Sequence, residues 1–313
     1  MDCLLCENKR VKIKESIDRQ EFIRLWATLN VDVSGDIKTP IVYKYHCNVC
    51  DLSFFDPENA GGDEFYSALG KWEWYYRHTG KTEYDITQKY ISDGTKILDV
   101  GSGRGELYNR ISHKVHYTGL ELSSKAVALA QEAGINVIKE NLFDHAKEHE
   151  GEYDIVCLFQ VLEHLSEVTE FIKSIKRSLK PGGLFIVAVP NNGGYLQYAY
   201  NNILNLPPHH TIQWNEQSLR YLGKRFNLVV KDVIYEELQD VHMKAHHQIL
   251  ITHKISKLVG MKQKSIRFGK KFSLISKLAQ ILTNAPLLKI FTHKFCFSKE
   301  AKGHSIVVLF ENN

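Results

Sequence analysis

The sequence predicts an α/β fold, in which a mainly parallel sheet carries helices on both faces and a small cysteine-bearing module precedes it. Three observations lead to this prediction. Apolar, strand-like runs alternate with helical patterns from Gly94 onward, a glycine turn follows the first run, and two Cys-x-x-Cys pairs lie near the N-terminus. Such alternation is typical of β-α units that build a parallel sheet.

Composition is consistent with a globular protein. The 313-residue chain is long enough for one large domain and a small one, and 43% hydrophobic with 24% charged residues is ordinary. The sequence has no run of about 18 apolar residues that would predict a transmembrane helix. Its N-terminus lacks the apolar core of a secretory signal, so we expect a cytoplasmic location.

The two Cys-x-x-Cys pairs are Cys3/Cys6 and Cys47/Cys50. Two intervening residues let both thiolates of a pair approach one metal ion, and two such pairs complete a tetrahedral S₄ site. The alternative is disulfides or redox motifs, but the missing secretion signal favours zinc. Four thiolates leave no open coordination position, so we expect a structural Zn²⁺ in a module over residues 1–58.

Residues 59–92 are rich in aromatic side chains at helix-like spacing, from Phe65 through Trp74 to Tyr90. They are interpreted as a helical connector packed on the next domain, or as a lid over a cofactor or substrate. Of the other two cysteines, Cys157 lies in an apolar run and is expected in the core, and Cys296 has no partner pattern.

The main domain is expected over residues 93–243, with its last strand at 303–313. The apolar runs predict strands and the patterns between them predict helices. Strands are predicted at 96–100, 115–120, 135–139, 153–159, 183–189, 228–235 and 304–310, and helices near 105–112, 123–133, 166–179 and 215–225.

A basic insertion, residues 244–302, separates the last two strands. Residues 241–299 contain 12 Lys and Arg but no Asp or Glu, although the whole chain carries only +4. Apolar residues from Phe272 to Leu282 fall largely on one helical face. The insertion is interpreted as a helical cap on the domain, as an amphipathic element on an anionic membrane surface, or as a site for RNA or another polyanion.

The first predicted strand ends in Asp99-Val100 and runs into glycines at 101, 103 and 105. Alternate glycines let the backbone pass close to a ligand, and a following helix would present N–H groups to it. The spacing is G-x-G-x-G rather than the dinucleotide pattern G-x-G-x-x-G. Glu121 ends the second strand 18 residues after Gly103, beside the turn, where its carboxylate can accept hydrogen bonds from both hydroxyls of a ribose.

Three later motifs follow in order: residues 140–144 (ENLFD), 153–164 (YDIVCLFQVLEH) and 179–183 (LKPGG). Together with the glycine turn and Glu121, they resemble the motifs of class I S-adenosylmethionine (AdoMet)-dependent methyltransferases, in the broad subgroup that contains quinone, sugar and RNA-end enzymes. The resemblance implies a Rossmann-like seven-stranded sheet whose last strand inserts antiparallel between its neighbours.

The resemblance also implies the cofactor contacts. Asn141 should meet the adenine amino group through its carbonyl oxygen, with the Leu142 N–H facing a ring nitrogen. The complete implied AdoMet set is Asp99, Gly101, Ser102, Gly103, Gly105, Glu121, Leu122, Asn141, Leu142, Phe159 and Gln160.

Methyl transfer is an in-line displacement, so the protein mainly orients the nucleophile and can remove its proton. Glu163 and His164 follow the fourth strand, and His209 and His210 follow the loop after the fifth. We predict Glu163, His164 and His210 as catalytic residues, because a histidine titrates near neutral pH and suits deprotonation of a hydroxyl.

RNA 3′-end 2′-O-methyltransferases of this subgroup bind a divalent metal through E-x-x-E-H and a histidine four residues before an aromatic. The matching residues here are Gln160, Glu163, His164 and His210 with Trp214, so a neutral Gln replaces the first Glu. One expectation is a weaker Mg²⁺ site at Glu163, His164 and His210. The other is a metal-free pocket lined by the histidines.

The expected reaction is O-methylation of a sugar, glycan or lipid-linked intermediate. The four-Cys module joined to this subgroup resembles enzymes of surface-polysaccharide and deoxysugar pathways. An RNA substrate, methylated at a 2′-O or in tRNA, is the alternative that the basic block favours. A non-catalytic zinc- and AdoMet-binding module is the third, and the intact Asp99, Gly101, Gly103 and Glu121 argue against it.

Overall fold

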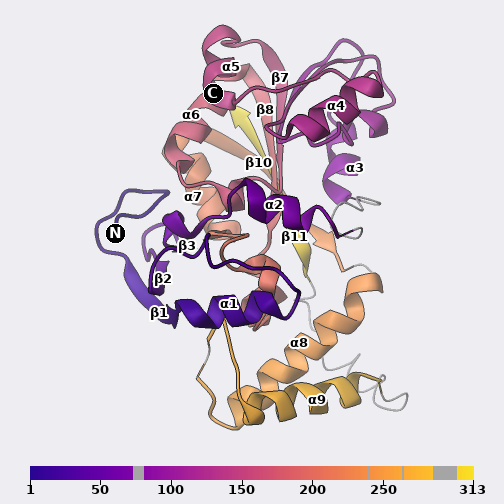
Figure 1. Ribbon diagram of the computed structural model, residues 1–313. Coiled ribbons are helices and arrows are strands. Elements are labelled where there is room, and N and C mark those ends of the chain that lie inside the picture. The colour runs from indigo at the N-terminus through magenta and orange to yellow at the C-terminus, as the bar shows by residue number, and fades with distance from the viewer. Residues whose placement is uncertain (73–80, 239, 263, 285–301) are drawn as a thin grey trace.

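The computed structural model describes residues 1–72, 81–238, 240–262, 264–284 and 302–313 (Figure 1). Among these, seven strands form the central sheet: β4 (Lys96–Val100), β5 (His116–Leu120), β6 (Val137–Ile138), β7 (Tyr153–Phe159), β8 (Leu179–Pro190), β10 (Leu228–Glu237) and β11 (Lys302–Asn312). Their order is β10-β11-β8-β7-β4-β5-β6. β4 to β8 pair in parallel, and β11 is antiparallel to both β8 and β10. The predicted fold class is therefore confirmed.

Both faces of this sheet are covered, because alternate residues of each buried strand point to opposite sides. Ile97 and Ile155 face α3 (Thr82–Gln88) and α4 (Ser124–Glu132). Leu98 and Val156 face α5 (Leu142–Glu148), α6 (Val168–Ser178) and α7 (Glu216–Phe226). Cys157 is fully buried between β4 and β8, as expected.

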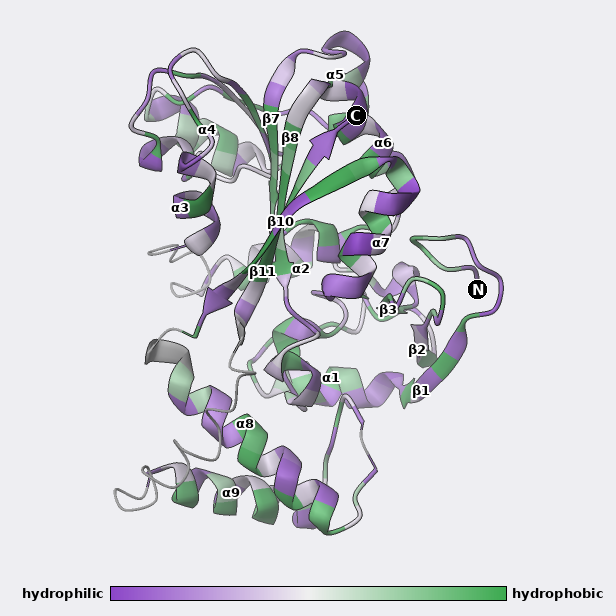
Figure 2. Cartoon of the chain, turned by 180° about the vertical axis from the view of Figure 1, so that it is seen from behind, coloured by the Kyte–Doolittle hydropathy of each residue, from purple (hydrophilic) through white to green (hydrophobic). Residues whose placement is uncertain are grey.

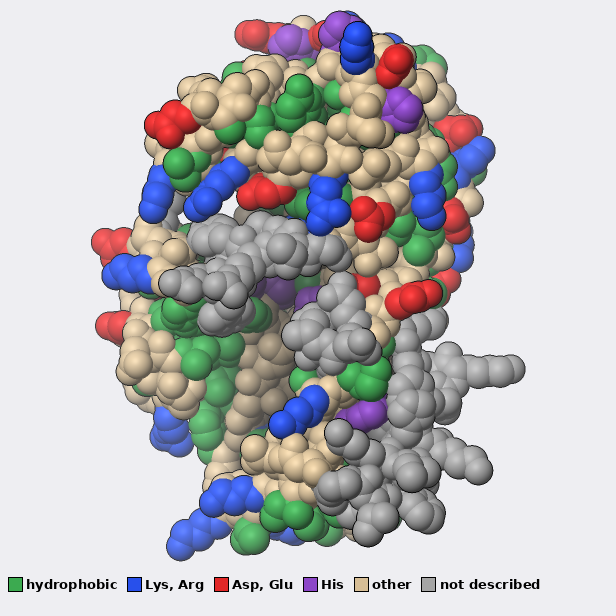
Figure 3. Space-filling model, turned by 90° about the vertical axis from the view of Figure 1, so that its right-hand side faces the viewer, with side chains coloured by type: hydrophobic (Ala, Val, Ile, Leu, Met, Phe, Trp, Pro, Cys, Tyr) green, Lys and Arg blue, Asp and Glu red, His purple; other side chains and the backbone are tan. Residues whose placement is uncertain are grey.

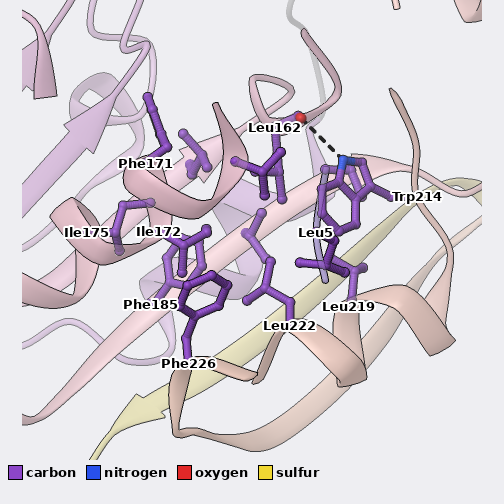
Figure 4. Packing of buried hydrophobic residues seen from close by; sticks show 14 of the residues in the cluster. Leu5, Leu162, Phe171, Ile172, Ile175, Phe185, Trp214, Leu219, Leu222 and Phe226 are labelled. Carbon is purple, nitrogen blue, oxygen red and sulfur yellow. Dashed lines mark hydrogen bonds between the residues drawn. The ribbon is translucent and has the colours of Figure 1, made fainter. Parts of the chain in front are cut away.

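The second face shows why α6 and α7 form where they do. Ile172 and Ile175 recur at helical spacing on α6, and Leu219 and Leu222 do so on α7, so each helix has one apolar stripe. These stripes meet Phe185 of β8 in a continuous core (Figure 4). Each such side chain contributes about 2 kcal/mol when fully buried.

Two helix predictions need correction. The helix expected at 105–112 is wrong, because the chain makes only a 3-10 turn at Tyr108–Arg110. Gly105 has φ +78°, which no helix accommodates, and Leu107 alone is buried among residues 106–112, so a helix would lack an apolar stripe. Conversely, α5 was missed; Asn141 caps it by accepting a hydrogen bond from the Asp144 N–H.

The N-terminal region forms a second, antiparallel sheet of β1 (Lys12–Asp18), β2 (Ile41–His46), β3 (Ser53–Phe55) and β9 (Ile212–Gln213). Its fourth strand comes from the chain after β8, and Phe54 pairs with Ile212. Helix α1 (Arg19–Ala27) buries Trp26, whose indole N–H donates to Pro207 O at 2.9 Å. The N-terminal sheet therefore holds the segment that carries His209 and His210.

The basic insertion contains α8 (Asp240–Leu258) and α9 (Lys270–Asn284), which pack on each other below α1 (Figures 1 and 2). Ile275 of α9 is buried. Other apolar side chains of the same helix, Leu274, Leu278 and Ile281, are exposed. In the part of the chain that the structure describes, no helix combines the length and apolarity needed to cross a membrane. Trp74 and Cys296 lie outside the described residues.

Candidate functional site

The glycine turn after β4 requires glycine for two reasons. Gly101, Gly103 and Gly105 have φ values of +73°, +58° and +78°, a region that other residues rarely adopt. A Cβ on Gly101 would also lie 2.5 Å from Val161 Cγ2, and one on Gly105 would lie 2.7 Å from Ile135 Cγ2. The turn therefore packs directly against the segment that leads from β7 to Glu163.

Glu121 lies across this turn. Its Oε2 accepts a hydrogen bond from the Gly103 N–H at 3.0 Å, and its Oε1 accepts one from the Ser123 N–H at 2.8 Å. The carboxylate is thus fixed at the carboxyl edge of the sheet, in the position from which it could bind a ribose. That contact stays a prediction, and so do the other AdoMet contacts.

Two predicted cofactor residues lie inside the fold beneath the turn. Asp99 is buried and accepts a hydrogen bond from the Tyr117 hydroxyl at 2.7 Å, and burial raises its pKa to about 7. Ser102 is also buried, with its hydroxyl 3.5 Å from Leu120 O. In this structure both side chains support the turn from below.

The remaining predicted AdoMet residues lie around the same edge. Leu122 is 66% exposed next to Glu121, whereas Leu142 and Phe159 are buried. Asn141 uses its amide to cap α5 and also donates to Asp144 Oδ2 at 2.7 Å. Its carbonyl oxygen has a second lone pair that can still accept a hydrogen bond from an adenine amino group.

Gln160 follows β7 with φ +57°, a conformation that is uncommon for residues other than glycine. Its amide donates to Ser305 Oγ of β11 at 3.4 Å, and it also hydrogen-bonds the buried Glu83. Gln160 is therefore engaged with β11 and α3.

Glu163 and His164 lie in a 3-10 turn, Leu162–His164, directly after β7. Glu163 is only 1% exposed, and within the described part of the chain neither of its carboxylate oxygens has a hydrogen-bond partner. Its Oε1 lies 3.8 Å from His210 Nε2 and 4.0 Å from His164 Nε2. The structure thus brings together all three residues that were predicted as catalytic.

A third histidine belongs to the same group. The ring of His209 stacks on that of His210 with centroids 4.3 Å apart. One ligand atom each of His164, His209 and His210 lies within 4.8 Å of the others. We call Glu163, His164, His209 and His210 the Glu/His cluster. Histidine side chains are visible in the hollowed middle of one face of the molecule (Figure 3).

Backbone hydrogen bonds hold the two halves of the Glu/His cluster together. The Thr211 N–H donates to Glu163 O at 3.2 Å, and Trp214 Nε1 donates to Leu162 O at 3.2 Å (Figure 4). Phe55 of β3 donates its N–H to Thr211 O at 2.8 Å. The N-terminal sheet therefore fixes the histidine pair against the end of β7.

The protonation states follow from these contacts. His164 Nδ1 lies 2.6 Å from His209 O, and His209 Nδ1 lies 2.9 Å from Leu204 O. A carbonyl oxygen only accepts, so each Nδ1 carries the proton and each Nε2 carries the lone pair. Burial lowers the pKa of His164 to about 4 and of His209 to about 3, and it raises the pKa of Glu163 to about 8.

Sequence reasoning named His209 together with His210 after the fifth strand, but predicted only His210 as catalytic. It did not connect Tyr66 with these residues. The Tyr66 hydroxyl of α2 (Asp63–Leu69) lies 3.0 Å from His164 Nδ1. No spacing rule connects residues that lie 98 positions apart. The lid interpretation of residues 59–92 included Tyr66, but it did not single this tyrosine out as a neighbour of His164.

The four N-terminal cysteines also converge, as expected for one metal site. Cys3 Sγ lies 3.4 Å from Cys50 Sγ, and Cys6 Sγ lies 3.4 Å from Cys47 Sγ. All four thiols are reduced, and their sulfur atoms lie within 4.8 Å of one another. In a tetrahedral zinc site, sulfur atoms are about 3.8 Å apart. The geometry fits a metal ion, and zinc binding stays a prediction.

Both cysteine pairs sit in matching turns. Glu7 and Asp51, each directly after the second cysteine of a pair, have φ values of +56° and +61°. Their N–H groups donate to Cys3 O and Cys47 O, respectively, and so close the two turns. This repeated conformation explains how two residues between cysteines direct both thiols inward.

Comparisons with known proteins agree with the fold. A methyltransferase-domain family model matches residues 76–233. A ubiquinone biosynthesis O-methyltransferase of Escherichia fergusonii is 32% identical over 108 residues, which cover 32% of this chain and 45% of that protein. The ubiquinone biosynthesis O-methyltransferase of Cronobacter sakazakii is 32% identical over 97 residues, which cover 29% of this chain and 40% of that protein. The chain thus spans less than half the length of these curated relatives.

A solved structure from Thermotoga maritima, described as a SAM-dependent methyltransferase and possible histamine N-methyltransferase, has a similar fold. Its TM-score is 0.50 with 13% identity, and the match covers 80% of this chain and 97% of that one. Identity this low supports the fold alone. The family model, in contrast, covers half of the chain, and this chain therefore belongs to the methyltransferase-domain family.

Proposed function

We propose that this protein is an AdoMet-dependent methyltransferase that methylates a hydroxyl oxygen of a sugar, glycan or lipid-linked intermediate. The observation that carries this proposal is the position of the Glu/His cluster. Val161, two residues before Glu163, packs on Gly101. The carboxylate and imidazole groups of the Glu/His cluster therefore lie close to the turn that would hold the cofactor. The residues of the turn fit AdoMet, because glycine keeps its surface clear of side chains and Glu121 is fixed beside it.

AdoMet, when bound, supplies an electrophilic methyl group on sulfur. The residues of the chain would orient both reactants: Glu121 would hold the ribose and the glycine turn would face the amino-acid end. The Nε2 lone pair of His164 would accept the hydrogen bond of an acceptor hydroxyl. That contact directs the oxygen toward the methyl group and gives its proton a destination as charge develops.

Two further observations bear on the acceptor. The similar proteins of Escherichia fergusonii and Cronobacter sakazakii are ubiquinone biosynthesis O-methyltransferases, which supports an oxygen acceptor but not a sugar. In addition, a hollow of about 440 Å³, part of it open to solvent, begins at Asn192 just after β8. Five of the ten polar residues in its lining are amides, and the others are Glu15, Lys44, Tyr200, Lys264 and Ser265. Each amide both donates and accepts, which suits a polyhydroxylated ligand. The amides are Asn192, Gln197, Asn202, Asn205 and Gln213.

The insertion supports a secondary proposal, peripheral contact with an anionic membrane. Leu274, Leu278 and Ile281 of α9 are exposed, and the surrounding segment carries lysines without any acidic residue. Vesicles containing phosphatidylglycerol should sediment the protein at low salt, whereas vesicles of phosphatidylcholine alone should not. Equal sedimentation with both would contradict this proposal.

Transfer of a labelled methyl group tests the proposed reaction. Extracts of cell-envelope glycans and glycolipids should accept label from AdoMet, and at subsaturating AdoMet Glu121→Ala should slow the transfer about 30-fold, in line with a loss of about 2 kcal/mol in cofactor binding. The same assay on total RNA is the competing arm. Label in RNA, with none in the glycan and lipid fractions, would replace the proposed substrate class.

A further inference from the structure

We propose that the hollow after β8 is a recognition subsite for an acidic sugar, that is, a sugar that carries a phosphate ester or a carboxylate beside free hydroxyls. Two lining side chains give it this specificity: Asn205 accepts a hydrogen bond from a hydroxyl, and Lys44 pairs with the anion. Only the role of the subsite, which is to hold the acceptor during methyl transfer, rests on the proposed function. Binding of the sugar itself needs no AdoMet.

The hollow lies where three parts of the chain meet. β1 and β2 contribute Glu15 and Lys44, and the segment after β8 contributes Asn192 and Asn205. The loop between α8 and α9 contributes Ser265, so the basic insertion forms one wall. The volume of about 440 Å³, part of it open to solvent, lies within the range of small-molecule sites.

Asn205 presents an unpaired acceptor in this hollow. It is 6% exposed, and its Oδ1 has no hydrogen-bond partner among the described residues. Asn192 Nδ2 donates to Pro190 O at 3.3 Å, so Asn192 Oδ1 is left to accept from Asn205 Nδ2 at 2.7 Å. Because Pro190 O can only accept, neither amide can be reversed. A buried acceptor without a partner is costly, and a ligand hydroxyl would satisfy it.

Lys44 is a partly buried cation with unused donors. An ammonium group has three N–H bonds, and within the described part of the chain only one of them makes a hydrogen bond, to Ser265 Oγ at 3.1 Å. Glu15 does not use the other two, since its Oε1 lies 3.9 Å from Nζ and both of its oxygens accept from Ser265. Burial lowers the pKa of Lys44, because Glu15 only partly replaces the water that the charge has lost. An anion in the hollow would complete this site.

The other charges around the hollow also favour an anion. Lys264 lines it and is exposed, and Arg267 lies over the ring of Tyr200, another lining residue, 3.9 Å from the ring centroid. Among the lining residues that the structure describes, Glu15 is the only acidic one. The local potential is therefore positive, which attracts an acidic sugar and discriminates against a neutral one.

One segment connects the hollow with the Glu/His cluster. Asn205 lies between Leu204, whose carbonyl accepts from His209 Nδ1 at 2.9 Å, and Leu206, whose carbonyl accepts from the His210 N–H at 3.1 Å. Leu206 also lines the hollow. A sugar bound there would thus adjoin the histidines that receive the acceptor hydroxyl.

Saturation-transfer NMR on the full-length chain without AdoMet is the first test. Glucose 1-phosphate and glucuronate should bind about tenfold more tightly than glucose, because only these two offer an anion to Lys44. The tighter of the two identifies the anion, phosphate or carboxylate, that the subsite prefers. Equal binding of all three sugars, or no binding of any of them, would overturn the proposal.

Two variants separate the two contacts. Lys44→Gln should remove the tenfold advantage of glucose 1-phosphate and keep the weaker binding of glucose. Asn205→Ala should weaken glucose 1-phosphate about fivefold, as expected for one lost hydrogen bond, and leave methyl phosphate, an anion without a sugar, unchanged. Retained methyl phosphate also shows that the hollow is still folded. An equal loss of both ligands in Asn205→Ala would contradict the role given to Asn205.

Ser265→Ala distinguishes anion binding from a structural role of Lys44. It removes the hydrogen bond of Lys44 to the loop but keeps the charge, so methyl phosphate should bind as in wild type. Lys44→Arg should do the same, as should the control Lys224→Gln, an exposed residue of α7 outside the hollow. Equal loss in Ser265→Ala and Lys44→Gln would mean that Lys44 only anchors the loop, against the proposal. AdoMet titration of wild type keeps the two proposals apart: normal AdoMet binding without any preference for acidic sugars would refute the subsite alone.

Discussion

The four-cysteine cluster and the Glu/His cluster are built in different ways. In the four-cysteine cluster, each Cys-x-x-Cys pair lies in one tight turn. A residue in the left-handed conformation, Glu7 in the first turn and Asp51 in the second, closes each of them. In the Glu/His cluster, the two halves come from the end of β7 and from a loop 45 residues later, after β8. The first cluster is a local feature of the sequence, and the second exists only after the sheet has formed.

The two clusters are nevertheless coupled. β9 follows the histidine pair directly and pairs with β3, which follows the second cysteine pair. Leu5, between Cys3 and Cys6, lies in the same apolar cluster as Trp214 (Figure 4). The four-cysteine cluster thus lies behind the strands that position the Glu/His cluster, and the following changes test how far that support reaches.

The largest effect is expected from Cys47→Ser. Losing one thiolate should release the zinc ion, and since metal binding contributes folding free energy to small modules, unfolding free energy should fall on the order of 5 kcal/mol. Methyl transfer should fall with it, because β3 no longer holds β9. Zinc analysis and denaturant unfolding measure both. The exposed neighbour Asn48→Ser is the control, and unchanged zinc in Cys47→Ser would break the comparison.

A medium effect is expected from pH on protein whose Glu/His cluster is metal-free. Folding raises the pKa of Glu163 from 4.5 to about 8, so between these values the native state holds a proton that the unfolded state has released. Stability from this group therefore falls as pH rises. The histidines, with lowered pKa values, act oppositely, but only below their unfolded pKa of 6.5.

Unfolding free energy should consequently drop by about 2 kcal/mol between pH 6.5 and 8, at roughly 1.4 kcal/mol per pH unit. Urea unfolding after dialysis against a chelator too weak to strip thiolate-bound zinc would measure it. In Glu163→Gln the decline should vanish. A decline of equal size in that variant would mean that another group is responsible.

The smallest effect is expected from Trp214→Phe, which removes the indole N–H that binds Leu162 O at 3.2 Å. A buried carbonyl left without a donor costs about 1–3 kcal/mol. The 3-10 turn that carries Glu163 and His164 should loosen, so the rate of methyl transfer should fall while the four-cysteine cluster keeps its metal. A labelled-methyl assay and zinc analysis measure the two effects. Loss of zinc from the four-cysteine cluster would show that Trp214 supports the whole module.

These differences also explain how much the sequence could predict. The strands were predictable because buried strands are continuous apolar runs, whereas the antiparallel direction of the last strand was implied only by the family resemblance. The helix after the glycine turn was predicted wrongly, since Gly105 and the exposed residues around Leu107 outweigh the usual pattern. Tyr66 could not be predicted as a neighbour of His164, because only the packing of α2 places it there.

Binding of AdoMet is the most direct test of the central claim. Titration calorimetry should show one AdoMet bound per chain of wild-type protein. Glu121→Ala should weaken that binding by about 2 kcal/mol, because it loses charge-assisted hydrogen bonds to the ribose. Glu132→Ala, an exposed carboxylate on α4, should bind like wild type. No heat of binding at millimolar AdoMet, from protein shown to be folded, would contradict the account.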